Sequence, residues 1–263
     1  MGTVSKALEL LNLFSDATPE MGLIEFAKSS GRDKATVHRY LGELEANGFL
    51  EQNPETKRYR LGVAVLRLSA IRERTFPTRA LVSERVSILA AKIGELAHAS
   101  LIQGLQMSPI CFRDGGTGST RVYFSEADML PLHATSSGLA ALAFGPDELL
   151  KKVKAKKLES YTKYTAIDQE QLIELVNETK DNGYAYSHQT FEDEVCSVAV
   201  PFFETEPHAI GTLAIAVPRV RMDALAVSEI AQLLWQESQI ISHELGGTIP
   251  APLKLKLEER KLI

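Results

Sequence analysis

The sequence predicts two domains: a mainly α-helical N-terminal domain closed by a β-hairpin, and a C-terminal α+β domain built on an antiparallel sheet. Within the first 62 residues, apolar side chains recur at helical spacing and two short β-rich runs follow. Beyond Pro77, strand-like runs are mixed with helical ones. The charge is also uneven, since residues 1–75 hold 11 Lys+Arg against 10 Asp+Glu while the whole chain has a net charge of -5.

The composition is that of an ordinary globular protein. The chain has 263 residues, 44% of them hydrophobic and 24% charged, which is enough for two domains with buried cores. It has no run of about 18 apolar residues and no signal-peptide pattern, so we expect a cytoplasmic protein without a membrane span. Because Cys111 and Cys196 lie far apart and the histidines are scattered, we expect no disulfide, metal site or cofactor.

Three helices are expected before the hairpin. The first covers residues 4–14, the second covers residues 23–31, and the third begins after Asp33 as its N-cap. The side chains expected to face the core are Val4, Ala7, Leu8, Leu11 and Phe14 in the first helix, Leu23, Ile24 and Ala27 in the second, and Val37, Tyr40, Leu41 and Leu44 in the third. Gly31 provides a tight turn between the last two, so their order matches a helix-turn-helix.

The hairpin after the third helix predicts a wing. Phe49 and Leu50 form one strand, Tyr59 and Leu61 the other, and residues 53–56 the turn. In a winged helix-turn-helix the third helix enters the major groove of DNA while wing cations reach phosphates. The expected DNA contacts are Lys34, Thr36, His38, Arg39 and Glu43 on the helix, and Lys57, Arg58 and Arg60 on the wing. A charged helix flank alone is equally consistent with a solvated surface, and the attached wing favours DNA binding.

Five segments spread over nearly the whole chain carry a resemblance to a known family. They are "SKALELLNLF", "DKATVHRYLGELEANGFLE", "RYRLG", "LPLHATSSGLAALA" and "NGYAYSHQTFEDEVCSVAVPFF". In order and spacing they resemble the IclR family of transcriptional regulators. The resemblance implies a winged helix-turn-helix, a linker helix, and a GAF-like domain that binds a small effector, commonly a carboxylic acid. It also implies a double-stranded DNA operator as partner and assembly as a homodimer or tetramer.

The expected domains are the winged helix-turn-helix at 1–62, the linker helix at 63–76, the effector domain at 77–249 and a tail at 250–263. The linker has apolar residues at Val63, Leu66 and Ile71, which fit an intrachain core or a dimer contact; the resemblance favours the dimer. The tail fits either a disordered end or a short contact segment.

The C-terminal domain is expected to begin with a helix at 78–94 that carries Val82, Val86, Leu89 and Ile93 on one face. Two strands around a short turn follow at 98–116, and a further strand is expected near 121–125. Helices are then expected at 137–145, 146–156 and 168–182, strands at 185–190, 194–203 and 209–218, and a long amphipathic helix at 222–247. This mixture predicts the antiparallel α+β class, and the GAF-like description comes from the resemblance.

The effector site is expected where small residues precede a helix that starts near Gly138. Free backbone N–H groups and the positive end of that helix can hold a carboxylate, although a serine there is more commonly only a cap. The candidate contacts in this segment are Ala134, Thr135, Ser136, Ser137 and Gly138. The resemblance adds Ser187, His188, Gln189, Ser197, Ala214 and Ala216, with His188 equally consistent with the outer strand face.

Four of these positions depart from the family pattern. Members that bind small keto acids carry an acidic residue, a cysteine and two serines where this chain has Ser187, Ser197, Ala214 and Ala216. A pocket with fewer polar groups cannot strongly prefer a keto-bearing or heavily hydroxylated ligand, so a less polar or larger carboxylate is expected. Period-two alternation points Cys196 away from Ser197.

An enzyme is the alternative reading, because GAF-like folds also support thiol redox chemistry with Cys111 or Cys196 as the nucleophile. Both cysteines lie in apolar strand runs without an adjacent Lys, His or helix start that would lower the thiol pKa. An inert structural thiol is therefore favoured, and no enzymatic activity is expected.

Overall fold

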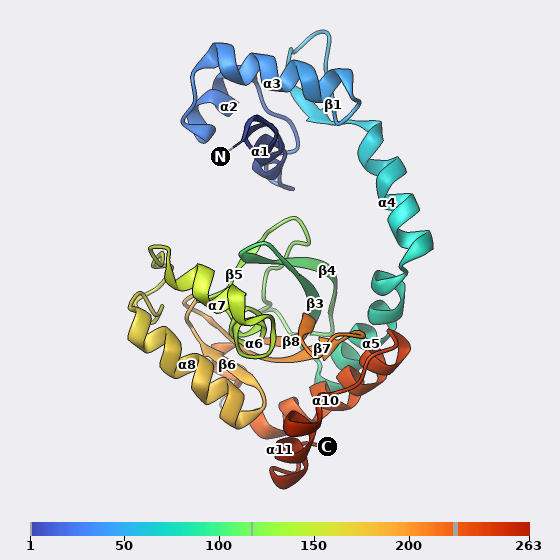
Figure 1. Ribbon diagram of the computed structural model, residues 1–263, viewed down its shortest axis with the longest axis vertical. Helices are drawn as coiled ribbons and strands as arrows, with labels where there is room; N and C mark the ends of the chain where they lie inside the picture. The colour runs from blue at the N-terminus through green and yellow to red at the C-terminus, as the bar shows by residue number, and fades with distance from the viewer. Residues whose placement is uncertain (1, 117, 223–225) are drawn as a thin grey trace. The chain divides into compact units, whose positions relative to one another are not determined.

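The computed structural model describes residues 2–116, 118–222 and 226–263. The chain forms an N-terminal unit, Met1–Pro77, and a C-terminal unit, Thr78–Ile263, each with its own hydrophobic core (Figure 1). None of the helices in the described ranges is both long and apolar enough to cross a lipid bilayer.

The N-terminal unit has the expected helix-turn-helix and wing. Its elements are α1 (Thr3–Leu8), the 3-10 helix η1 (Glu9–Leu13), α2 (Leu23–Ser30), α3 (Lys34–Ala46), β1 (Leu50–Gln52), β2 (Tyr59–Leu61) and α4 (Val63–Thr75). The Asp33 side chain accepts a hydrogen bond of 2.9 Å from the backbone N–H of Thr36, which confirms it as the N-cap of α3. Gly31 ends α2 with φ of 63°, a left-handed conformation that suits glycine.

The core of this unit confirms the expected face of α3 and corrects the first two helices. Val37, Tyr40, Leu41 and Leu44 are all buried. Val4, Leu8 and Ile24 were expected inside but are 73%, 47% and 71% exposed, whereas Leu10 and Phe26 are fully buried. The first helix tightens into a 3-10 turn at Glu9, which changes the spacing of its inner side chains. In α2 the core position belongs to Phe26, whose ring packs edge-on against Phe14 and Tyr59.

The C-terminal unit is an antiparallel α+β domain, as expected. Its sheet has the order β5-β4-β3-β8-β7-β6. The strands are β3 (Leu96–Gln103), β4 (Gln106–Asp114), β5 (Leu130–Pro131), β6 (Ala185–His188), β7 (Val195–Phe203) and β8 (Ala209–Pro218). The helices are α5 (Thr78–Ile93), α6 (Ser136–Phe144), α7 (Asp147–Lys154), α8 (Gln169–Asn182), α9 (Arg219–Met222), α10 (Val227–Glu244) and α11 (Ala251–Glu259).

Successive side chains of each strand point to opposite faces of this sheet, and each face packs against different helices. Leu213, Ile215 and Val217 of β8 share a core with α5 and α10. Ala214 packs on the opposite face in a second core with α6, α7 and α8 (Figure 1). Because the strand side chains on this second face are small, α6 lies close to β7 and β8.

Three segments differ from the expected elements. Residues 121–125 form no strand: the edge of β4 pairs with β5 instead, and Phe124 packs against the rings of His98 and Phe112. A long helix was expected at 222–247. The observed helix α10 begins only at Val227, and residues 223–225 lie outside the described residues. The tail at 250–263 contains the helix α11, and Leu257 of α11 and Leu262 after it are buried in the core of the C-terminal unit.

Candidate nucleic-acid interface and ligand cavity

The outer face of α3 carries the polar residues that the sequence singled out. Lys34, His38, Arg39 and Glu43 are exposed, and Thr36 is half-buried beside the Asp33 cap. The guanidinium of Arg39 lies 4.9 Å from the centre of the Tyr40 ring. Since the opposite face of α3 is held in the core, these side chains have a fixed place on the surface.

The three wing cations are not equivalent. Arg58 donates hydrogen bonds of 2.8 Å to the Glu25 carboxylate and 2.8 Å to the Glu20 carbonyl oxygen. Arg60 pairs with Glu51 at 3.0 Å. Among the described residues, the side chain of Lys57 has no ion pair or hydrogen-bond partner, and its backbone has φ of 58° at the wing tip. The structure therefore leaves Lys57 as the wing cation that is free to meet a phosphate.

A surface hollow joins the helix and the wing. It is bordered by the first turn of α2, by Lys34 and His38 of α3, and by Lys57 and Arg58 of the wing. Glu25, which neutralises Arg58, also lines this hollow and accepts a 2.7 Å hydrogen bond from the N–H of Gly22. The Gly22 N–H and the Arg58 guanidinium lower the pKa of Glu25. The carboxylate therefore stays ionised, and its pair with Arg58 persists at neutral pH.

We expect Lys57→Ala to make the salt dependence of DNA binding shallower by about one unit, because one phosphate contact is lost. Arg58→Ala is expected to leave the slope near that of the unchanged protein, since Glu25 already neutralises Arg58. The measurement is Kd for a random-sequence duplex at several salt concentrations. A slope changed by Arg58→Ala and not by Lys57→Ala would assign the phosphate contact to Arg58.

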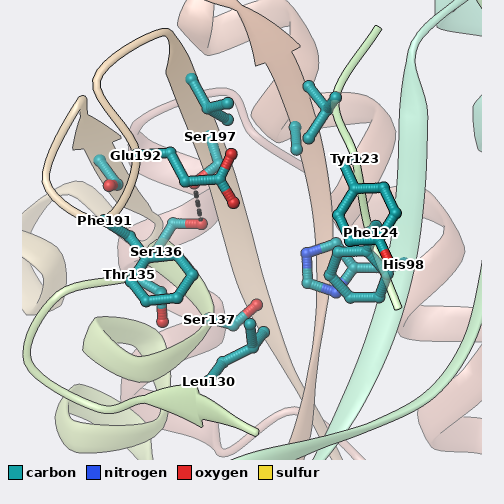
Figure 2. A pocket seen from close by; sticks show the side chains of 14 residues that line it. His98, Tyr123, Phe124, Leu130, Thr135, Ser136, Ser137, Phe191, Glu192 and Ser197 are labelled. Carbon is teal, nitrogen blue, oxygen red and sulfur yellow. Dashed lines mark hydrogen bonds between the residues drawn. The ribbon is translucent and has the colours of Figure 1, made fainter. Parts of the chain in front are cut away.

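The C-terminal unit holds a cavity between the start of α6 and the face of the sheet that α6 covers (Figure 2). It encloses about 480 Å³ of empty space, part of which is open to solvent. The lining residues are His98, Val122, Tyr123, Phe124, Leu130, Thr135, Ser136, Ser137, Ser187, Phe191, Glu192, Val195, Ser197 and Ala216. Six of the predicted effector contacts are among them: Thr135, Ser136, Ser137, Ser187, Ser197 and Ala216.

The first turn of α6 presents unused hydrogen-bond donors to this cavity. Thr135 is the N-cap and accepts a 3.0 Å hydrogen bond from the N–H of Gly138. The N–H groups of Ser136 and Ser137 have no acceptor among the described residues. The Ser137 hydroxyl also lacks a partner there, although the residue is only 1% exposed. A buried hydroxyl without a partner is costly, so this turn is suited to receive an acceptor.

Ser136 takes a different role from Ser137. Its Oγ lies 2.7 Å from Oγ of Ser197 on β7, and this hydrogen bond ties the start of α6 to the sheet. Ser197 in turn pairs with Ser187 on β6 and with Ala216 on β8, which places all three on the cavity face. The expectation that Cys196 points away from Ser197 is confirmed, since Cys196 belongs to the core on the other face.

Five predicted effector contacts lie outside the cavity lining. Ala134 is buried and uses its carbonyl oxygen to accept from Thr190, and Ala214 is covered by α6. Gly138 has its Cα pressed against the backbone of Leu132. His188 is exposed on the outer strand face next to Tyr164 and Tyr186, and the Gln189 amide donates to the Asp193 carbonyl oxygen. The structure therefore brings together six of the eleven candidates.

The sequence did not predict the remaining residues of the cavity lining. His98 of β3 lies with Tyr123 and Phe124 across the cavity from the start of α6, whereas Phe191 and Glu192, from the loop between β6 and β7, lie on the same side as Thr135 and Ser136 (Figure 2). The His98 ring stacks on Phe124 with 4.4 Å between centroids, and complete burial lowers the pKa of His98 to about 3. Alternation on β3 was an available signal, since Ala97 and Ala99 face the core and leave His98 on the cavity side.

The two thiols that redox chemistry would use are buried. Cys111 is 2% exposed, and its burial raises the pKa of the thiol. Cys196 is fully buried, with Sγ 3.5 Å from Nδ1 of His188. The expectation that no histidine adjoins these thiols is wrong for Cys196, because β6 pairs His188 directly opposite it. A thiol exchange reaction requires access to the sulfur, which neither residue offers in this structure.

Two family models match the chain. The model described as "IclR helix-turn-helix domain" matches residues 3–54, and "Bacterial transcriptional regulator IclR C-terminal" matches residues 76–243. Among similar proteins, the HTH-type transcriptional regulator XynR of Escherichia coli (strain K12) is 26% identical over 93% of this chain and 97% of its own length. The glycerol operon regulatory protein of Streptomyces coelicolor is 25% identical over 93% of this chain and 96% of its own.

Solved structures agree with this match. A crystal structure described as an IclR transcriptional regulator from Silicibacter sp. TM1040 is 36% identical, covers 95% of this chain and 98% of its own, and has a TM-score of 0.85. An IclR homologue from Microbacterium hydrocarbonoxydans, complexed with 4-hydroxybenzoate, is 21% identical with a TM-score of 0.73 over 93% of this chain and 99% of its own. The second likeness bears on the fold alone.

Proposed function

Because this chain belongs to the IclR family of transcriptional regulators, we propose that α3 and the wing read a DNA operator and that a carboxylic acid in the cavity changes operator affinity. A helix-turn-helix domain and a C-terminal ligand-binding domain are properties of the family assignment itself. The operator contacts, the class of effector, the oligomeric state and a location in the cytoplasm with the DNA are the proposal.

The observation that carries the DNA-reading role is the division of α3 into two faces. Four apolar side chains hold one face in the core, and Lys34, His38 and Arg39 stand exposed on the other. An arginine on a recognition helix can donate two hydrogen bonds to a guanine, whereas Lys57 on the wing supports phosphate contact.

The effector role rests on the first turn of α6. Two backbone N–H groups, the positive end of the helix dipole and the unpartnered Ser137 hydroxyl converge on one side of the cavity. This set of donors suits a carboxylate. A ligand that binds two arrangements of the protein unequally shifts their populations, and operator affinity changes with them.

A second copy of the chain is the proposed partner of α4. None of the residues of this helix is buried, and Val63, Leu66 and Ile71 are exposed on it. Exposed apolar side chains along one helix favour association, and closed dimers are the commonest assembly. A dimer would present two recognition helices to half-sites about 34 Å apart.

The experiment that tests the DNA-reading role is selection from a random duplex library, followed by binding of variants to the enriched sequence. Arg39→Ala is expected to weaken that complex by about 1 to 3 kcal/mol and to relax the preference at one base position, because a base contact is lost. Arg67→Ala on α4, which removes the same charge outside the hollow, is the control and is expected to keep the preference unchanged.

Three results would contradict this proposal in different ways. A loss that is equal on all duplexes would make Arg39 a phosphate contact. If no sequence is enriched even with carboxylic acids present, the proposed operator reading is wrong. An enriched sequence without a repeat would speak against the dimer and leave base reading by α3 intact.

A further inference from the structure

One carboxylate lies among the cations of the hollow between α3 and the wing. Lys34, Lys57 and Arg58 border this hollow together with His38, and Glu25 is the single acidic residue among the described residues that line it. Lys34 and Lys57 have no carboxylate partner in the part of the chain that the structure describes, whereas Arg58 is paired with Glu25. The hollow therefore offers DNA two available cations and a third that the protein's own carboxylate already holds.

Backbone pairing brings Glu25 and Arg58 together from distant parts of the sequence. Met21, just before α2, and Tyr59 of β2 exchange backbone hydrogen bonds of 2.9 and 2.8 Å, so Arg58 lies beside the first turn of α2. The two terminal nitrogens of Arg58 donate to the two carboxylate oxygens of Glu25 at 3.3 and 2.8 Å. A guanidinium binds the phosphate of DNA with the same two-point geometry.

Both partners are held in this arrangement by further hydrogen bonds. Oε2 of Glu25 accepts a 2.7 Å hydrogen bond from the backbone N–H of Gly22, and Nη2 of Arg58 donates to the Glu20 carbonyl oxygen at 2.8 Å. The pair still reaches solvent, since the side chains of Arg58 and Glu25 are 38% and 49% exposed. A phosphate that approaches Arg58 therefore meets a carboxylate that already occupies the same donors.

Building on the proposed contact of α3 and the wing with DNA, we propose that Glu25 is an internal phosphate mimic: it competes with the DNA backbone for Arg58 and limits affinity for every sequence. A cation that neutralises one phosphate releases about one counterion, so loss of one such contact weakens binding about tenfold at about 0.1 M salt. The charge of Glu25 also repels phosphates that approach Lys34 and Lys57. Since neither effect depends on the bases, Glu25 sets the absolute affinity and leaves sequence preference to α3.

The test removes the charge of Glu25 and keeps its hydrogen bond. Glu25 is the N3 residue of α2, where a glutamine side chain also accepts from the N-cap backbone, so Glu25→Gln is expected to retain the fold. Kd of the full chain is measured for two duplexes of unrelated sequence at several salt concentrations. Glu25→Gln is expected to tighten both complexes by a common factor of about ten at about 0.1 M salt, and to make the salt dependence steeper by about one unit.

Two further measurements identify Arg58 as the residue that is released. In an Arg58→Ala background, Glu25→Gln is expected to leave the salt slope unchanged, because no guanidinium is set free. Glu51→Gln removes the same charge and frees Arg60, but this pair lies outside the lining of the hollow, so the slope is expected to stay unchanged. Circular dichroism verifies the fold of each variant, and Glu25→Ala, which also frees Arg58, provides a second measurement of the slope.

The outcomes separate this inference from the proposed DNA-reading role. If Lys57→Ala makes the slope shallower while both Glu25 variants leave it unchanged, the hollow binds DNA and the competition by Glu25 is wrong. If Glu51→Gln steepens the slope as much as Glu25→Gln, net charge explains the gain and the inference is also wrong. A gain confined to one duplex would contradict a phosphate contact. If neither Lys34→Ala nor Lys57→Ala changes the slope, the proposed DNA-contacting face itself is wrong.

Discussion

Gly138→Ala is expected to lower the free energy of unfolding of the C-terminal unit by about 3 kcal/mol or more. A Cβ atom at this position would lie 2.3 Å from the carbonyl oxygen of Leu132 and 2.4 Å from its Cα. Both neighbours are backbone atoms, so no side-chain rotation relieves the contact, and α6 or the segment after β5 must move. Gly138 is therefore the packing residue that lets α6 lie against this segment.

The measurement is urea unfolding followed by circular dichroism, with Gly42→Ala as the control. Gly42 lies within α3 and has open space around it. Alanine is favoured over glycine in a helix by about 1 kcal/mol, so this control is expected to stabilise the N-terminal unit. Similar small gains from both substitutions would show that the close approach at Gly138 is absent in solution.

Acid is expected to destabilise the C-terminal unit through His98. Burial lowers the pKa of this imidazole from the usual 6.5 to about 3. Between these values the unfolded chain binds a proton that the folded chain does not, so stability falls as the pH falls. From pH 7 to pH 5 the expected loss is about 2 kcal/mol.

His98→Phe is expected to remove this loss, because phenylalanine keeps a ring against Phe124 and does not titrate. Urea unfolding at pH 7 and pH 5 gives the difference for each variant. His208→Gln is the control, since His208 is exposed in the loop between β7 and β8 and its substitution leaves the buried imidazole in place. An equal pH dependence in the unchanged protein and His98→Phe would mean that His98 is hydrated in solution.

The features that the sequence predicted correctly are local ones. Asp33 caps a helix three residues away, and Val37, Tyr40, Leu41 and Leu44 repeat at the spacing of one helix face, so neighbouring residues determine both. The strands at 185–190, 194–203 and 209–218 were found for the same reason. The inner face of the first helix was predicted from α-helical spacing, and it was wrong because the chain forms a 3-10 turn after α1.

Contacts between distant residues could not be predicted in this way. Arg58 meets Glu25 across 33 positions, so its neutralisation is invisible in the basic run "KRYR". The wall that carries His98 depends on strand register, since β3 places His98 opposite Ala214. The start of α6 was recognisable from its small residues and from the family resemblance, and the opposite wall carried neither signal.

The central position of β8 has a kinetic consequence. Leu101 on β3 pairs with Gly211 on β8, which lies 110 positions later, and β8 also pairs with β7. Bringing such distant strands together requires closing a long loop before the contacts form, so we expect the C-terminal unit to refold much more slowly than the N-terminal unit. The cavity has walls on β3, β7 and β8, so we expect it to be complete only after these strands have paired. Ligand binding then requires a fully assembled sheet, and a partly folded chain is expected not to bind its effector.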